Sequence, residues 1–137
     1  MKIQLIRNAT MKLTYAGQTI LTDPMLSPKD ANDPFAGVAR NPTVELPHTL
    51  EQILHRVDGV LVSHGHPDHF DSVASAELPK TIPVLCQPDD ELRITEDGFR
   101  TVIPIETRNE WNGITISRTG GQHGSGKIHA EIGRAHV

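Results

Sequence analysis

The chain opens with three short runs in which apolar or β-branched residues alternate with polar ones. Residues 3–7, 11–15 and 18–22 fit the two-residue period of strands, and Ala16-Gly17 predicts a hairpin turn between the second and the third. Residues 23–47 then contain five prolines among Asn and Asp, without an apolar period. This composition predicts a long surface loop.

The apolar period changes to that of a helix after residue 48. Thr49 and Gln52 form the T-x-x-Q pattern of a capping box. The apolar positions that follow share one helical face: Leu50, Ile53, Leu54 and Val57. Asp58-Gly59 ends this expected helix, and residues 60–62 form an uninterrupted apolar run. Such a run is typical of a strand that is buried on both faces of a sheet.

Strands and helices alternate in the rest of the chain. The expected elements are helices at residues 73–78 and 89–95 and strands at residues 84–86, 101–105, 108–111 and 114–118. Asn112-Gly113 predicts the hairpin turn between the last two strands. A glycine-rich loop follows at residues 120–126. The alternation predicts a fold of the α/β or mixed α+β class.

Composition narrows the class of protein. The 137 residues have a net charge of −4, which argues against a nucleic-acid partner. No apolar stretch is long enough for a membrane span. The single cysteine, Cys86, excludes an internal disulfide and is expected to be a buried, inert thiol. We therefore expect a cytoplasmic protein of one domain.

Eight histidines are many for so short a chain, and three of them stand close together. His64, His66, Asp68 and His69 follow the buried strand directly. Because side chains two residues apart share a face of extended backbone, His64 and His66 can hold one ion. The glycine and the proline between these residues fit a tight turn that brings Asp68 and His69 to the same cavity. Imidazole and carboxylate ligands suit Zn²⁺, with Mn²⁺ and Fe²⁺ as alternatives.

This H-x-H-x-D-H loop after a buried strand resembles the metallo-β-lactamase superfamily. The opening strands and the segment Thr22-Asp23-Pro24 are similar to its branch of L-ascorbate-6-phosphate lactonase-like hydrolases. The resemblance extends from Met1 to about Gly126. It implies that the chain forms the N-terminal part of an αββα sandwich.

The resemblance also implies a ligand set and a reaction. His64 and His66 would bind a first metal together with His123, and Asp68 and His69 would bind a second. Two divalent ions, expected to be zinc, would activate a hydroxide that attacks a small-molecule lactone, ester or phosphoester. Asp68 would be the catalytic residue, because it would bind the second metal and orient the hydroxide.

The C-terminal end departs from the pattern that this resemblance implies. Two further ligands, a bridging Asp and a late His, have no counterpart after Gly126. Residues 132–137 resemble the translation of a sequencing-library adapter. We therefore expect residues 1–131 to be a truncated domain that is inactive alone, with a non-native tail at residues 132–137.

The sequence leaves the roles of several other residues open. Asp23 would either orient the ligand loop or simply form a turn before proline. Asp71 is expected to cap the following helix, and His48 and His55 to be surface residues. A metal-binding protein without catalytic activity is one alternative function.

A nucleotide-binding module is a further alternative. Gly121–Lys127 matches the phosphate-binding pattern G-x-x-x-x-G-K. The pattern requires Ser or Thr at the next position to hold Mg²⁺, and Ile128 stands there instead.

Overall fold

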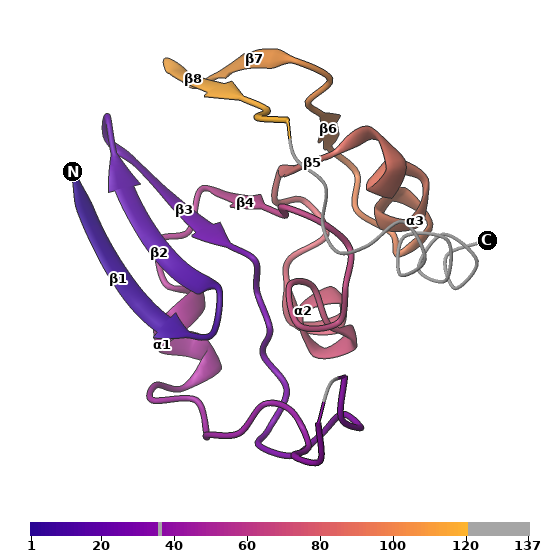
Figure 1. The fold of residues 1–137 in the computed structure, drawn as a ribbon. Coiled ribbons are helices and arrows are strands. Elements are labelled where there is room, and N and C mark those ends of the chain that lie inside the picture. The colour runs from indigo at the N-terminus through magenta and orange to yellow at the C-terminus, as the bar shows by residue number, and fades with distance from the viewer. Residues whose placement is uncertain (36, 121–137) are drawn as a thin grey trace.

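A six-stranded mixed sheet organises the molecule (Figure 1). The computed structural model describes residues 1–35 and 37–120. The sheet has the order β1 (Lys2–Arg7), β2 (Thr10–Tyr15), β3 (Gln18–Thr22), β4 (Gly59–Leu61), β5 (Val84–Cys86) and β6 (Val102–Pro104). β1, β2 and β3 pair antiparallel, whereas β3, β4, β5 and β6 pair parallel. The α/β class predicted from the sequence is confirmed.

Tight turns produce the antiparallel half of this sheet. Ala16 and Gly17 both have positive φ, at 49° and 77°, and Tyr15 pairs with Gln18 across them. A two-residue turn with this backbone matches the twist of the strands that it joins. The hairpin predicted at Ala16-Gly17 is confirmed.

The parallel half is buried on both faces, as the apolar run at residues 60–62 predicts. Val60 and Val62 are 0% and 1% exposed and belong to a cluster with the helices. Leu61 packs into a second cluster on the opposite face, together with Leu85 and Ile20. Because β4 lies between two parallel neighbours, both its edges are paired, and of its residues only Leu61 is partly exposed.

Three short helices cover one face of the sheet. They are α1 (Leu50–Leu54), α2 (Ser72–Glu77) and α3 (Glu91–Glu96), which the 3₁₀ turn η1 (Pro88–Asp90) precedes. Each contributes a buried residue to the same cluster: Ile53, Ala74 and Ile94. Within the described part of the chain, none of the helices has the length and apolar character needed to cross a bilayer.

The capping box at the start of α1 forms as predicted, but the helix ends early. The Gln52 backbone N–H donates to Thr49 Oγ1 at 3.2 Å, and the Thr49 N–H donates to Gln52 Oε1 at 3.0 Å. The helix stops at Leu54 rather than Val57, because the C-cap residue His55 has an extended backbone with ψ of 124°, and Arg56 follows with a left-handed φ of 57°. Val57 still packs against the core from the turn that follows.

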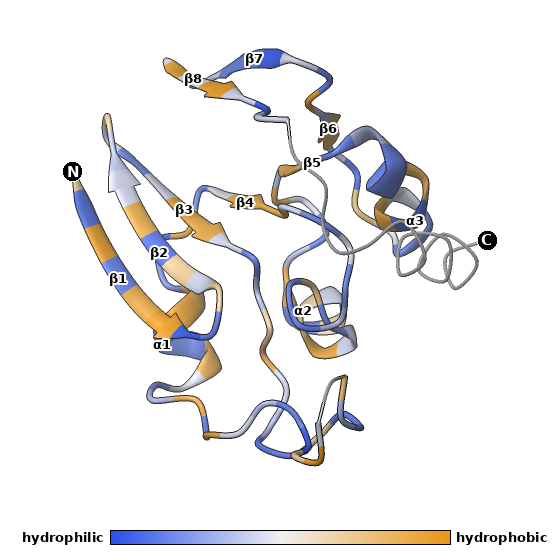
Figure 2. Cartoon of the chain, viewed as in Figure 1, coloured by the Kyte–Doolittle hydropathy of each residue, from blue (hydrophilic) through white to orange (hydrophobic). Residues whose placement is uncertain are grey.

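A separate hairpin covers part of the opposite face. β7 (Arg108–Trp111) and β8 (Ile114–Ser117) form a two-stranded sheet around the predicted Asn112-Gly113 turn. Trp111 and Ile114 pack on the sheet in the second cluster. Figure 2 shows that apolar residues line the inner strands on which the hairpin lies.

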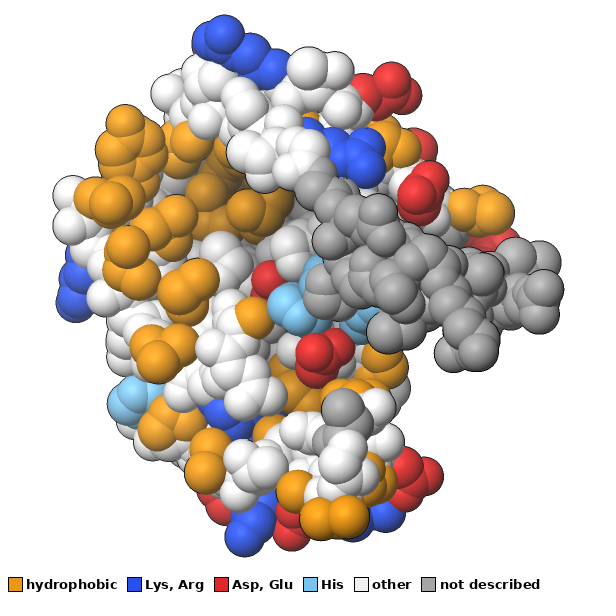
Figure 3. All heavy atoms as spheres, in the orientation of Figure 1, with side chains coloured by type: hydrophobic (Ala, Val, Ile, Leu, Met, Phe, Trp, Pro, Cys, Tyr) orange, Lys and Arg blue, Asp and Glu red, His pale blue; other side chains and the backbone are white. Residues whose placement is uncertain are grey.

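The outer part of that face is open. Ile3 and Leu5 of β1 are 57% and 65% exposed. In Figure 3 hydrophobic side chains spread over β1, β2 and β3 and continue into the hollow beside the hairpin.

The described residues of the predicted loop, 23–35 and 37–47, lack regular structure, as predicted, apart from one bridge between Asn32 and Asn41. The expectation of a surface loop is wrong for residues 23–27, which are buried. The Arg7 guanidinium explains this burial, because it donates to the carbonyl oxygens of Met25 at 2.8 Å and Ser27 at 2.7 Å. The start of the loop is therefore held against β1, and its first residue, Asp23, has a defined place.

Candidate metal centre

The predicted ligand loop lies at the carboxyl edge of the parallel strands. Asp23 follows β3, Ser63 and His64 follow β4, and Gln87 follows β5. Because neighbouring parallel strands end at the same edge of a sheet, residues far apart in the chain meet there. The backbone N–H of Asp23 extends the pairing by donating to the carbonyl oxygen of Leu61 at 2.8 Å.

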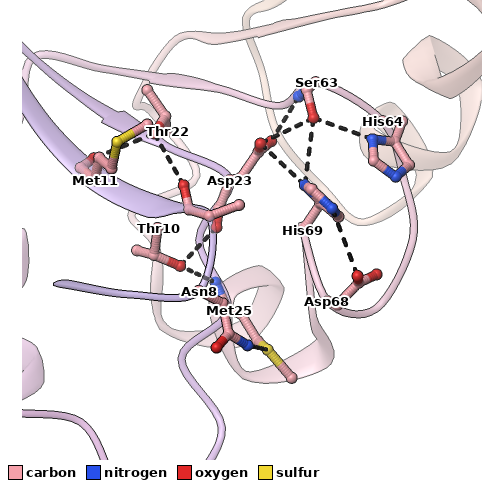
Figure 4. Close-up of polar contacts among 11 residues, drawn as sticks. Asn8, Thr10, Met11, Thr22, Asp23, Met25, Ser63, His64, Asp68 and His69 are labelled. Atoms are coloured by element: carbon pink, nitrogen blue, oxygen red, sulfur yellow. Dashed lines mark hydrogen bonds and ion pairs between the residues drawn. The ribbon is translucent and has the colours of Figure 1, made fainter. Parts of the chain in front are cut away.

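Asp23 is the residue that joins these segments (Figure 4). Its Oδ1 accepts the backbone N–H of Ser63 at 2.6 Å, and its Oδ2 accepts the Ser63 hydroxyl at 2.8 Å. The same Oδ2 lies 3.0 Å from His69 Nδ1. Asp23 is 8% exposed and has a φ of 41°. Of the two roles that the sequence left open, the structure favours orientation of the ligand loop.

His69 is held between two carboxylates. Its Nδ1 contacts Asp23, and its Nε2 lies 3.5 Å from Asp68 Oδ2. Burial lowers the pKa of His69, but the hydrogen bond and charge of Asp23 and the charge of Asp68 more than offset burial and raise it above its usual value. An Asp that accepts the Nδ1 proton leaves Nε2 as the nitrogen that would bind a metal.

The other two imidazoles gather beside His69. The ring centroid of His64 lies 3.9 Å from that of His69 and 4.4 Å from that of His66. The Ser63 hydroxyl is 3.0 Å from His64 Nδ1 and 3.3 Å from His69 Nδ1. The structure thus brings together His64, His66, Asp68 and His69, the four residues of the predicted loop.

The chemistry of this donor set fits a divalent cation. Imidazole nitrogens and a carboxylate are ligands of zinc, manganese and iron, and the Asp23–His69 contact is of the kind that orients metal-binding histidines. Among residues 1–35 and 37–120, no group of three or more His, Cys, Asp or Glu side chains has the geometry needed to hold a metal ion. The predicted ligand His123 lies outside the described residues, as does the phosphate-loop pattern Gly121–Lys127.

A cavity of about 470 Å³ opens beside His64. Apolar side chains of Leu61, Ile105 and Ile116 line it, and Gln87 and Arg118 add polar groups. The cavity lies where β4 and β5 end, so a molecule bound in it would contact the first histidine of the loop.

Cys86 also lines this cavity, and its surroundings disfavour the thiolate form. Burial raises the pKa of Cys86 to about 12, with smaller contributions from the charges of Asp90 and Glu91. A thiol with this pKa is protonated at neutral pH and is a poor nucleophile. The prediction that Cys86 is buried is confirmed, and its raised pKa favours the expected lack of reactivity.

Three further assignments from the sequence agree with the structure. Asp71 caps α2, because its Oδ1 accepts the Ala74 backbone N–H at 2.8 Å. His48 and His55 are exposed. Ser63, which contacts both His64 and His69, was not singled out from the sequence. Its place between a buried strand and the first ligand of the loop is the signal that could have identified it.

Comparisons with known proteins agree with this fold. A family model described as a beta-lactamase superfamily domain matches residues 18–132. The UPF0173 protein YddR of Bacillus subtilis is 39% identical over 132 residues, which are 93% of this chain and 52% of that protein.

Two solved structures are similar in both sequence and fold. A possible metal-dependent hydrolase from Veillonella parvula is 41% identical with a TM-score of 0.87, and the match covers 93% of this chain and 51% of that one. An isothiocyanate hydrolase from Delia radicum gut bacteria is 39% identical with a TM-score of 0.87, covering 100% of this chain and 55% of that one. The chain spans about half the length of the relatives that it matches.

Proposed function

The chain belongs to the beta-lactamase superfamily, and from this premise we propose that it carries the principal metal-binding loop of a metal-dependent hydrolase. His64 and His66, with His123, would hold one ion, and Asp68 and His69 would hold a second. Zinc is the expected metal because imidazole ligands predominate. The observation that carries this proposal is the contact of Asp23 with His69 Nδ1, since a surface histidine would have no need of a buried carboxylate behind it.

A divalent ion held by this loop would supply Lewis-acid chemistry, since it would lower the pKa of a water molecule and polarise the substrate bond. The side chains prepare the site for that chemistry. Asp23 and Ser63 contact the Nδ1 atoms of His69 and His64, which assigns the Nε2 atoms as the nitrogens that would bind a metal. Asp68 has a side chain that is 40% exposed, so its carboxylate is open to water and can hold or accept a proton at Oδ2.

The cavity beside His64 is the proposed binding place for the substrate. Its apolar walls exclude water from one side, while Arg118 and Gln87 offer donors to a polar group. A small lactone, ester or phosphoester is the substrate class that the resemblance to lactonase-like hydrolases favours.

A second candidate substrate is an isothiocyanate. The relative described as an isothiocyanate hydrolase is 39% identical over the whole of this chain. The apolar side chains of Leu61, Ile105 and Ile116 in the cavity also suit the hydrocarbon group that an isothiocyanate carries. The two substrate classes share an electrophilic carbon or phosphorus that water attacks.

The experiment that tests metal binding compares the chain with its His64→Ala variant after dialysis against zinc. The wild-type chain is expected to retain zinc, and His64→Ala to lose most of it. His55→Ala is the matched control, because His55 is exposed on the far end of α1 and is expected to leave the zinc content unchanged. Equal zinc content in the wild type and His64→Ala would refute the proposal.

Substrate class is tested with the chain fused to the second half of the Veillonella parvula relative. Initial rates with a lactone, an aryl ester, an aryl phosphoester and an alkyl isothiocyanate are compared. A preference of at least tenfold for one class would assign it. Equal, metal-independent rates for all four would argue against a hydrolase.

A further inference from the structure

The residue between the two histidines of the H-x-H pair has no space for a side chain. A Cβ atom built on Gly65 would lie 2.2 Å from Asp90 Oδ1, 2.9 Å from Asp90 Cγ and 3.1 Å from Arg93 Nη2. Gly65 does not have a positive φ, so its backbone conformation is one that other residues adopt. The glycine is therefore required by the approach of Asp90 and not by the turn.

Asp90 is buried at this place and accepts a hydrogen bond. It is 7% exposed, and its Oδ2 accepts a hydrogen bond from Gln87 Nε2 at 2.8 Å. It stands at the start of α3, but its side chain makes no capping hydrogen bond there. A buried carboxylate is costly, and helix capping does not account for this one. Its other oxygen instead lies against the backbone of Gly65.

Arg93 supports the loop one helical turn later. Its guanidinium lies 5.7 Å from the centroid of the Phe70 ring, and Phe70 directly follows His69. Its Nη2 approaches the same point above Gly65 as Asp90 Oδ1. Its Nε and Nη2 are buried and donate no hydrogen bond to a described residue. The start of α3 thus contacts both ends of the ligand loop.

We propose that Asp90 is a positioning residue for the metal centre. It occupies the space that a side chain at Gly65 would take and so fixes the backbone that carries the His64 and His66 imidazoles. Arg93 supports the far end of the loop. The inference rests on the proposed function. Ligand atoms must lie within a few tenths of an ångström of their ideal distances from a metal, so a backbone that shifts between two ligands weakens both. Among the described residues, Asp90 forms no hydrogen bond or ion pair with a proposed ligand nitrogen, so it would act through the backbone of Gly65.

The test uses titration of the 137-residue chain with cobalt chloride, followed through visible d–d absorption, which reports both affinity and ligand geometry. Asp90→Ala is expected to weaken cobalt binding by about 10- to 100-fold and to alter the absorption bands, as is typical of residues that orient metal ligands. Asp90→Asn keeps the shape and an oxygen for Gln87, so it is expected to stay within about threefold of the wild type. Asp89→Asn is the matched control, because Asp89 is exposed beside Asp90.

A double substitution separates positioning from a general loss of stability. Gly65→Ala places a methyl group where Asp90 Oδ1 lies and is expected to weaken cobalt binding as much as Asp90→Ala. In Gly65→Ala/Asp90→Ala the methyl group takes the vacated space, and affinity is expected to return at least tenfold toward the wild type. Thermal unfolding of each metal-free variant checks that it folds. If Asp90→Ala does not fold, the cobalt affinity of the double variant is compared with that of Gly65→Ala.

The outcomes distinguish the two proposals. Additive losses in the double variant, or an Asp90→Asn variant as weak as Asp90→Ala, would overturn the positioning role while the wild type still binds cobalt. A wild-type chain that binds cobalt no better than His64→Ala would overturn the proposed function, and the positioning role with it.

Discussion

Asp23 and His69 stand 46 positions apart in the chain, yet Asp23 Oδ2 lies 3.0 Å from His69 Nδ1. The contact exists because β3 and β4 are parallel neighbours, so that the residues following each strand meet at one edge of the sheet. It selects the tautomer of one proposed ligand and ties the loop to the core. Four consequences of this and related contacts can be measured.

The stability of the metal-free chain should depend on pH through His69. Burial lowers its pKa, but the Asp23 hydrogen bond and the charges of Asp23 and Asp68 raise it above the usual value of 6.5. A group whose pKa is raised by folding contributes stability that is complete below its unfolded pKa and is lost as the pH rises through its folded pKa. The free energy of unfolding should therefore fall between pH 6.5 and that higher value.

The Asp23→Asn variant provides the check on this pH dependence. It removes the charge behind His69, so NMR titration should give a lower His69 pKa, and the fall in stability with pH should become shallower. Asp97→Asn, on an exposed residue at the end of α3, should change neither quantity. An unchanged His69 pKa in Asp23→Asn would contradict the prediction.

Asp68→Asn should affect catalysis more than the first metal. In the chain fused to the second half of the Veillonella parvula relative, turnover is expected to fall by about 100-fold or more, because a positioned proton acceptor is lost. Zinc bound through His64 and His66 should remain, so metal analysis should show the loss of about one ion. Turnover close to that of the unsubstituted fusion would show that Asp68 has only a structural role in the turn.

Gly59→Ala should detach the β7–β8 hairpin from the sheet. A Cβ on Gly59 would lie 2.7 Å from Trp111 Cζ2, so the indole ring must move outward. The expected cost is about 1–3 kcal/mol of stability, as for other overpacked core positions. Trp111 is the only tryptophan, so a red shift in fluorescence would report its exposure. Gly17 is unsuitable as a control because of its positive φ, whereas Gly120→Ala meets no atom of the described residues within 4 Å and should leave the spectrum unchanged.

Cys86 should resist alkylation in the folded chain. Its pKa of about 12 and its exposure of 2% leave almost no accessible thiolate at neutral pH. Reaction with a thiol reagent should follow the rate of unfolding and rise steeply in denaturant. Rapid labelling of the folded chain at pH 7 would show instead that the cavity beside His64 admits the reagent to the sulfur.

Much of the fold follows from local sequence signals. The turns at Ala16-Gly17 and Asn112-Gly113 and the Thr49 capping box act over a few residues, and each forms as predicted. The apolar run at residues 60–62 predicts a strand buried on both faces, which the clusters around Val60 and Leu61 confirm. The early end of α1 was not predictable in this way, because a left-handed Arg56 has no local signal.

The candidate site, like the fold, depends partly on local sequence and partly on tertiary structure. The sequence by itself determined which donors are available, since the spacing of His64, His66, Asp68 and His69 places imidazoles and a carboxylate in one loop after a strand. Only the tertiary structure decided that Asp23 orients His69 and that Asp90 fills the space above Gly65. Those contacts depend on which strands are neighbours and in which register they pair. Strand order and register result from packing of the whole core, and no short stretch of sequence encodes them.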